Sequence, residues 1–315
     1  MPPASNNMLK LARGLFSDAS ARTAFLDALQ NPREYSPALL WTRSAPGSHS
    51  ISVDKRLDWQ PEFVDRLVPG QRPGLDELHT QGFYYCLDMS SVFSASAMLA
   101  LAAAPSLVLD MCSSPGGKGI FAWRAFKPRL IICNEVIGKR IGALVSNLQR
   151  CGIQPVQVSS QDSARFKESA ENAFDLVICD VPCSGQSLMA RKGEAPGCFH
   201  PATINLNSNR QKRIIANSAA CVAPGGALHY ITCTYSRQEN EAVIEWFLKK
   251  FPEFRPLAVP ALEQNQSRLA DFPAYRLWPQ EGIGAGGFCC LLKNEGTGSP
   301  READLSKINV RWKCP

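Results

Sequence analysis

Short apolar runs alternate with helical segments from residue 107 to residue 293, and this alternation is the strongest constraint on the fold. Apolar strands alternating with helices predict a mostly parallel sheet that helices cover on both faces. In α/β sheets of this kind, ligands bind at the carboxyl ends of the strands. Strands are predicted at residues 107–110, 130–135, 156–159, 174–181, 226–233, around 277 and at 288–293, and helices at 117–126, 138–151, 205–221 and 239–250.

The first 80 residues have a different pattern, which predicts a small, separate α+β module. Two Pro-Gly pairs end this module, so we divide the chain into residues 1–80 and residues 81–315. A buried, alanine-rich helix is expected near the start of the second part, over residues 90–104. Within the module, helices are predicted at residues 8–16 and 21–29, short strands at 38–41 and 51–53, and a further helix beginning at Pro61.

Residues 107–118, with the sequence LVLDMCSSPGGK, have the order of strand, small-residue turn and helix start that forms a ligand site. Glycines let the backbone approach a ligand, and the N–H groups of a helix start attract an anionic group. Glu135 ends the next strand, 25 residues after Asp110, where an acidic side chain suits the hydroxyl groups of a ribose. The turn has neither the dinucleotide nor the P-loop pattern. The predicted cofactor is therefore a nucleoside without a pyrophosphate, and S-adenosylmethionine is the obvious member of that class.

Two cysteines lie at the ends of neighbouring predicted strands. Cys183 lies in the polar turn DVPCSG, which also contains Asp180, and Cys233 lies just before a helix start, which favours a thiolate. Two thiols and a carboxylate that face one crevice suit covalent catalysis on a carbon that needs activation. We therefore expect all three side chains to belong to one active site.

Positive charge indicates a polyanionic partner. The formal net charge is +6, and residues 118–150 contain seven Lys or Arg against one acid, Glu135. Arg191 and Lys192 lie shortly before Phe199, and basic residues with a stackable ring suit single-stranded RNA. The alternative interpretation of the basic residues is a solvated helix face.

Cysteine usage and hydropathy exclude other classes. The twelve cysteines include no C-x-x-C pair, so we expect no zinc or other metal and a reducing cytoplasmic location. The chain has no signal peptide pattern and no run of ~18 apolar residues, so no membrane span is expected.

These motifs resemble those of the RNA cytosine-5 methyltransferases of the Nop/Sun family, over roughly residues 80–295. The matching pieces are DMCSSPGGK (110–118), NEVIGKR (134–140), QDS (161–163), DVPCSG (180–185) and TCTYSRQENE (232–241). The resemblance implies a class I methyltransferase fold, with a Rossmann-like, mostly parallel sheet of seven strands. It also implies S-adenosylmethionine as cofactor and RNA as partner, either rRNA or, as the other candidate, tRNA. A monomer is expected.

The resemblance further implies a role for each site residue. Cys233 would be the nucleophile, and Cys183 the second cysteine that helps to release the product. Asp180 would contact both cofactor and target base, and Lys118 would stabilise charge near them. The implied cofactor-binding residues are Cys112, Ser113, Ser114, Pro115, Gly116, Gly117, Lys118, Glu135, Arg140, Asp162 and Asp180.

Two other functions stay open at this point. The DVPC sequence could belong to a methyltransferase that acts on an exocyclic nitrogen, which would leave Cys233 without a role. The chain could instead be a catalytically silent RNA-binding or ribosome-assembly factor. The first alternative predicts a methyl group on nitrogen, and the second predicts RNA binding without a cofactor.

Overall fold

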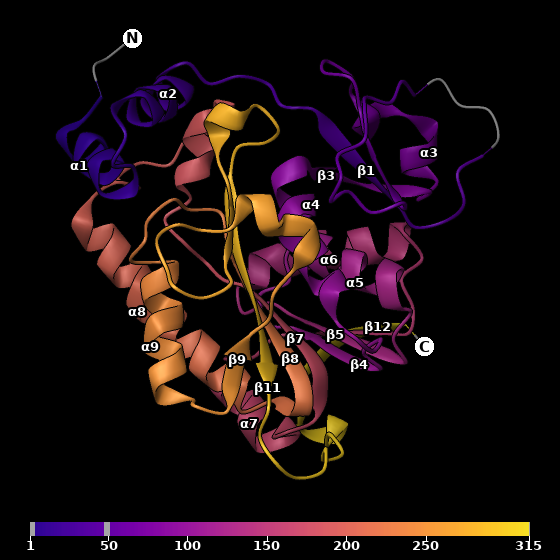
Figure 1. Cartoon of the computed structure of the whole chain (residues 1–315). Helices are drawn as coiled ribbons and strands as arrows, with labels where there is room; N and C mark the ends of the chain where they lie inside the picture. The colour runs from indigo at the N-terminus through magenta and orange to yellow at the C-terminus, as the bar shows by residue number, and fades with distance from the viewer. Residues whose placement is uncertain (1–3, 47–50, 315) are drawn as a thin grey trace.

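The computed structural model describes residues 4–46 and 51–314 (Figure 1), so residues 1–3, 315 and 47–50, which include His49, lie outside the described part. Within that part, a nine-stranded sheet has the order β10-β11-β8-β7-β4-β5-β6-β12, with β9 paired to β11. Five central strands are parallel: β4 (Leu107–Asp110), β5 (Leu130–Asn134), β6 (Val156–Ser159), β7 (Phe174–Asp180) and β8 (Val222–Thr232). Four antiparallel strands complete it: β9 (Phe254–Pro256), β10 (Tyr275–Leu277), β11 (Gly287–Asn294) and β12 (Val310–Cys314).

Helices cover both faces of this sheet, because successive residues of each strand point to opposite sides. Val108 belongs to the core on one face and its neighbour Leu109 to the core on the other. The first core contains residues of α4 (Met89–Ser96), α5 (Gly117–Phe126) and α6 (Gly138–Arg150). The second contains residues of α7 (Ala164–Ala170), α8 (Pro201–Ala219) and α9 (Glu241–Lys250). The predicted α/β fold is therefore confirmed.

The sheet has nine strands in the described part, where seven were predicted. The two additional strands give weak sequence signals: β9 has three residues, and β12 alternates between half-buried and exposed positions at the edge, against β6. The predicted helix over residues 90–104 is shorter, because α4 passes into a 3-10 helix that ends at Ala100. None of the described helices has the length and apolar character that crossing a bilayer needs.

A second sheet is formed by three short antiparallel strands in the order β2-β1-β3. They are β1 (Pro37–Trp41), β2 (Val64–Arg66) and β3 (Tyr84–Asp88), with the short helix α3 (Glu77–Thr80) before β3. The prediction of a helix beginning at Pro61 was wrong, because residues 64–66 pair with β1 instead. The predicted strand at residues 51–53 forms only a single bridge, between Val53 and Leu67. Since β3 pairs with β1, this sheet extends past residue 80.

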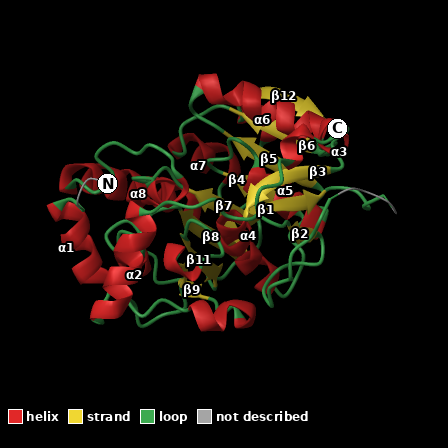
Figure 2. Cartoon of the chain, turned by 90° about the horizontal axis from the view of Figure 1, so that it is seen from above, coloured by secondary structure: helices red, strands yellow, loops and turns green. Residues whose placement is uncertain are grey.

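The N-terminal helices α1 (Asn6–Leu15) and α2 (Ala19–Gln30) lie away from this small sheet. Figures 1 and 2 show them beside α8, whereas β1–β3 lie above α5 and α6. Phe25 of α2 packs edge-on against Tyr235, with ring centroids 5.0 Å apart, and Leu40 of β1 joins the core beneath α4 and α5. The two parts of the N-terminal region therefore pack against different parts of the larger domain.

Candidate active site

A cavity of about 410 Å³ opens at the carboxyl ends of β4, β7 and β8. Residues from several places in the chain surround it, among them the start of α4, the turn after β4, the turns after β7 and β8, and the turn before β11. Eight of the residues predicted for the site line this cavity: Cys112, Ser114, Pro115, Lys118, Arg140, Asp180, Cys183 and Cys233. Parallel strands bring these turns together, because their carboxyl ends meet at one edge of the sheet.

The turn after β4 is held in one conformation by its glycines and by Ser113. Gly116 has a φ of +114°, which a side chain would disfavour, and a Cβ at Gly117 would lie 2.8 Å from Leu87. Ser113 donates its N–H to the carbonyl of Asn134 (2.8 Å) and its hydroxyl to the carboxylate of Asp110 (2.8 Å). The turn therefore presents its backbone to the cavity in a fixed position.

Asp110 ends β4 and is completely buried beneath this turn. Burial raises the pKa of its carboxyl to about 7, although the hydroxyl of Ser113 opposes this shift. Its second oxygen, Oδ1, has no hydrogen-bond partner in the described part of the chain. A buried acceptor without a partner is costly, which makes it a candidate to accept a hydrogen bond from a bound molecule.

Lys118 and Asp180 form an ion pair inside the cavity, with Nζ and Oδ2 3.1 Å apart. Burial disfavours the ammonium, but the carboxylates of Asp180, Asp88 and Asp110 outweigh it and raise the pKa of Lys118 above its ordinary value. Lys118 therefore stays charged. The pair places one positive and one negative group side by side, where a base edge or a developing charge could meet both.

Cys183 and Cys233 bring their sulfur atoms to 3.2 Å from each other. Strands β7 and β8 are hydrogen-bonded neighbours in parallel register, with Asp180 opposite Ile231, so the turns that follow them lie next to each other. Cys233 is exposed and lines the cavity, whereas Cys183 is half-buried. A hydrogen bond from the Cys183 thiol lowers the pKa of Cys233, and the same contact raises the pKa of Cys183. Cys233 is therefore the better thiolate of the two.

Glu239 is a site residue whose role sequence reasoning missed. Its completely buried carboxylate accepts hydrogen bonds from the backbone N–H (2.9 Å) and the hydroxyl (2.5 Å) of Ser184, and from the side chain of Gln211 (2.9 Å). It thereby ties the turn that contains Cys183 to the segment that follows Cys233. The signal was an acid in the QENE sequence directly after the second thiol, at a predicted helix start.

The 3-10 helix η3 (Gln186–Arg191) supports the turn that contains Cys233. The backbone N–H of Ser187 donates to the carbonyl of Cys233 (3.2 Å), and the side chain of Gln186 accepts a hydrogen bond from the N–H of Tyr235 (3.0 Å). These contacts hold the turn after β8 against the turn after β7.

Five predicted cofactor residues do not line the cavity: Ser113, Gly116, Gly117, Glu135 and Asp162. Glu135 is buried at the end of β5, and its carboxylate accepts from the N–H of Ile137 (2.9 Å) and pairs with Arg140 (3.3 Å). Arg140 also donates to the carbonyl of Ser114, so it joins Glu135 to the edge of the cavity. Asp162 is exposed and pairs with Arg213 at 3.0 Å. No group of three or more metal-ligating side chains occurs among the described residues.

A buried ion pair anchors the segment after Cys233. Arg276 of β10 donates to both carboxylate oxygens of Glu241, at 2.6 Å each, and to the carbonyl of Tyr235 at 3.0 Å. We expect Arg276→Met to lower the free energy of unfolding by about 3–5 kcal/mol, because it leaves the Glu241 charge buried and unpaired. Urea denaturation measures this change. The matched control is Arg255→Met, which removes an exposed pair with Glu295 (3.9 Å) and is expected to have little effect. Equal losses in both variants would contradict the prediction.

The hydrogen bond between the two thiols predicts how Cys233 reacts with iodoacetamide. Since that bond lowers the pKa of Cys233, its alkylation in the wild type should reach half-maximal rate below the pH of an ordinary thiol. In Cys183→Ala the donor is gone, and the midpoint should move to higher pH. Peptide mass spectrometry of protein alkylated across a pH series measures both midpoints, with Cys86→Ala as the control. An unchanged midpoint in Cys183→Ala would show that the thiols do not interact.

Comparison with known proteins gives consistent matches. The family model described as 16S rRNA methyltransferase RsmB/F matches residues 97–293, which is more than half of the chain. Ribosomal RNA small subunit methyltransferase F of Serratia proteamaculans is 27% identical over 261 residues, covering 80% of this chain and 54% of that protein. The protein of the same name from Escherichia coli O9:H4 is 33% identical over 183 residues, covering 57% and 38%. The chain thus spans about half the length, or less, of these curated relatives.

Solved structures show the same fold. NSun6 from Pyrococcus horikoshii superposes with a TM-score of 0.74 at 14% identity, covering 93% of this chain and 99% of that one. A methyltransferase homologue from the same organism gives a TM-score of 0.69 at 21% identity, covering 92% and 100%. At these identities the likeness concerns the arrangement of helices and strands alone.

Proposed function

The chain belongs to the RsmB/F family of 16S rRNA methyltransferases, and from this membership we propose that it methylates carbon 5 of a cytosine in RNA. The family match confirms the resemblance found in the sequence motifs. The observation that carries the proposal is the pair of sulfur atoms 3.2 Å apart, in the same cavity as the turn after β4 and the Lys118–Asp180 pair. We propose rRNA as the substrate, with tRNA as the other candidate, and a cytoplasmic monomer remains a prediction.

The proposed cofactor is S-adenosylmethionine, which supplies a methyl group activated by a sulfonium. The residues present fit such a molecule: Cys112, Ser114 and Pro115 of the turn after β4 line the cavity, and the buried Oδ1 of Asp110 beneath this turn has no hydrogen-bond partner among the described residues. Carboxylates near the cavity suit a sulfonium, and Glu135, joined to the cavity edge by Arg140, is the proposed partner of the ribose. NSun6, which shares the fold, was solved with SFG, an analogue of S-adenosylmethionine.

The proposed reaction begins at Cys233. Carbon 5 of cytosine is a poor nucleophile, and attack of the Cys233 thiolate on carbon 6 makes carbon 5 enamine-like, so that it can take the methyl group. The attack pushes an electron pair toward the ring nitrogen. We propose that the Lys118–Asp180 pair hydrogen-bonds that edge of the base and stabilises the charge that develops there, which its 3.1 Å ion pair in the cavity supports. The base has to leave any stack to reach these groups.

Release of the product is the proposed task of Cys183. The proton on carbon 5 passes to a water molecule, and its electron pair forms the double bond between carbons 5 and 6. The bond between carbon 6 and the Cys233 sulfur breaks at the same time, and that sulfur recovers its electron pair as a thiolate. Cys183 lies 3.2 Å from this sulfur and is half-buried, so it can hold or move a proton at the point of elimination. Its raised pKa suits a group that holds its proton until it is needed.

Identification of the modified nucleoside tests the proposal. The protein is incubated with methyl-labelled S-adenosylmethionine and with transcribed, unmodified 16S rRNA or tRNA. The RNA is then digested to nucleosides for mass spectrometry. We expect label in 5-methylcytidine. Label in a nucleoside methylated on an exocyclic nitrogen, or RNA binding with no cofactor affinity by calorimetry, would overturn the proposal.

A further inference from the structure

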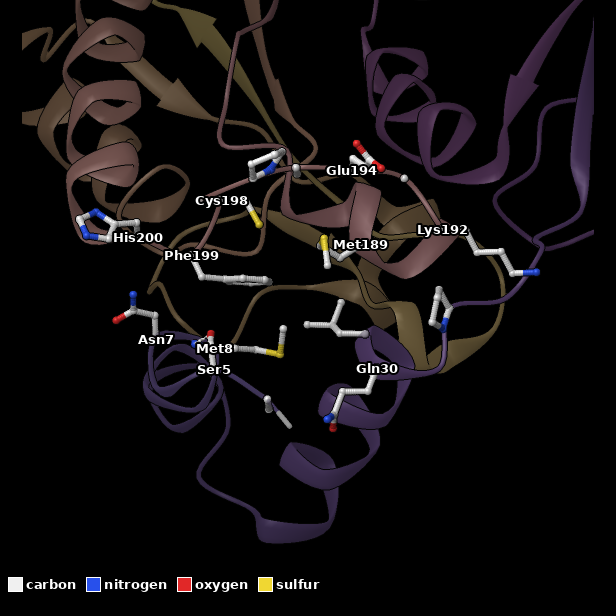
Figure 3. Close-up of a pocket in the computed structure, with 17 residues that line it drawn as sticks. Ser5, Asn7, Met8, Gln30, Met189, Lys192, Glu194, Cys198, Phe199 and His200 are labelled. Atoms are coloured by element: carbon white, nitrogen blue, oxygen red, sulfur yellow. Dashed lines mark hydrogen bonds between the residues drawn. The ribbon is translucent and has the colours of Figure 1, made fainter. Parts of the chain in front are cut away.

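A second, larger cavity of about 750 Å³ lies between the N-terminal helices and the loop that follows η3 (Figure 3). Its walls are mostly apolar, and the ring of Phe199 lies between Met189 on one side and Met8 on the other. Polar or charged side chains of Asn7, Gln30, Lys192, Glu194 and His200 also line it. A cavity of this size, with apolar walls and a few polar groups, is typical of a site for a flat organic group.

This cavity shares a wall with the candidate active site. Residues of η3 and its C-terminal end line both spaces: Leu188 and Arg191 line the catalytic cavity, whereas Met189 and Lys192 line the second one. The side chain of Gln186, also in η3, donates to the carbonyl of Cys198 in the second cavity (3.0 Å). A molecule that enters the catalytic cavity is therefore close to the second one.

The segments that frame the second cavity hold most of the net positive charge of the chain. Residues 4–36 and 186–219 contain nine Lys or Arg against four Asp or Glu, a net of +5, and the whole chain has +6. Helix α8, which begins beside the cavity, has three basic and no acidic residues. At the cavity itself Lys192 is accompanied by Glu194, so the positive charge that suits phosphate groups comes mainly from the surrounding segments.

We propose that the second cavity binds an unstacked base of the RNA strand that flanks the target cytosine, with the base against the ring of Phe199. This inference rests on the proposed function and adds a specificity site to it. The base enters between the ring and a methionine, whose flexible side chain can move aside, while Lys192 and the neighbouring basic residues meet the phosphates. Stacking on an aromatic side chain accepts any base, and the polar groups at the rim would favour some bases over others.

Binding of a labelled RNA to three variants tests this site. The probe is a fluorescein-labelled strand of twelve cytidines, and its matched control is a strand of equal charge in which tetrahydrofuran spacers replace the bases. Fluorescence anisotropy at fixed salt gives the affinity of the full chain for each. We expect Phe199→Leu to weaken binding of the cytidine strand roughly tenfold and to leave the base-free strand unaffected. Phe199→Tyr, which retains the ring, should bind as the wild type does.

Controls separate this site from the folding of the protein and from the proposed function. Phe272→Leu makes the same change at a half-buried position that packs against the core of α7, α8 and α9 and does not line the second cavity, so it should not alter RNA affinity. Calorimetry with S-adenosylmethionine should give equal affinities for all variants, which shows that each is folded. Equal RNA binding by Phe199→Leu and wild type would overturn the base site while the methyltransferase assignment stands. Wild-type protein that neither binds nor methylates RNA would overturn both.

Discussion

Cys233→Ala is expected to lose methyl transfer almost completely, by about four orders of magnitude in rate. The reason lies in the chemistry of the base, because carbon 5 cannot take a methyl group until a nucleophile adds at carbon 6. Among the twelve cysteines, Cys233 alone combines exposure toward the cavity with a pKa lowered by a neighbouring thiol. Transfer of labelled methyl groups to transcribed rRNA, followed over time, measures the loss.

The control for this prediction is a cysteine outside the cavity. Cys86→Ala removes a half-buried thiol in the small sheet, whose pKa is raised by burial to about 11, and should leave the rate unchanged. Affinity for S-adenosylmethionine should stay within about twofold in Cys233→Ala, because the thiol acts on the base and leaves the turn after β4 intact. Substantial activity in Cys233→Ala would contradict the covalent mechanism.

Cys183→Ala is expected to stall the reaction after methyl transfer and to accumulate protein bound covalently to RNA. Without the second thiol, the bond between the Cys233 sulfur and carbon 6 forms but breaks slowly, because no neighbouring group assists the elimination. A band that migrates slowly in a denaturing gel and disappears after ribonuclease treatment measures the adduct. Most of the protein should be in this band when RNA is in excess, whereas the wild type should show almost none.

The double variant tests whether the adduct forms through the predicted sulfur. Cys183→Ala combined with Cys233→Ala should form no adduct, and peptide mapping of the single variant should place the cytosine on Cys233. An adduct that persists in the double variant would refute both assignments. An adduct that appears with Cys233→Ala alone would show that Cys183 is the nucleophile.

The strands and the two thiols could be predicted because their signals are local. The parallel strands contain short apolar runs, as in residues 176–179, and a polar residue at the end of the strand marks the side of the sheet where ligands bind. Cys183 and Cys233 stand just after two such runs. The distance of 3.2 Å between their sulfur atoms requires β7 and β8 to be neighbours in the sheet. The order of the strands in the chain suggests this pairing, but no single residue predicts it.

The small sheet and the support of the cysteines could not be predicted because they depend on contacts far apart in the chain. Strand β2 has three residues, two of them polar, and is a strand only because β1 lies beside it. Glu239 looks like a solvent-facing acid in a polar stretch, but Ser184 and Gln211 surround it in the fold. Pro61 favours a helix start, because proline is common at the first position of helices. The pairing of residues 64–66 with β1 overrides that preference.

The pairing of Arg276 with Glu241 has a consequence for interpreting inherited or laboratory variants of this protein. Strand β10 contains none of the recognisable motifs, so a scan for conserved signatures would treat damage there as harmless. Arg276, however, holds the segment that follows Cys233, more than forty residues upstream. A substitution of Arg276 should therefore shift the nucleophile, and an assay would record it as a loss of methyl transfer.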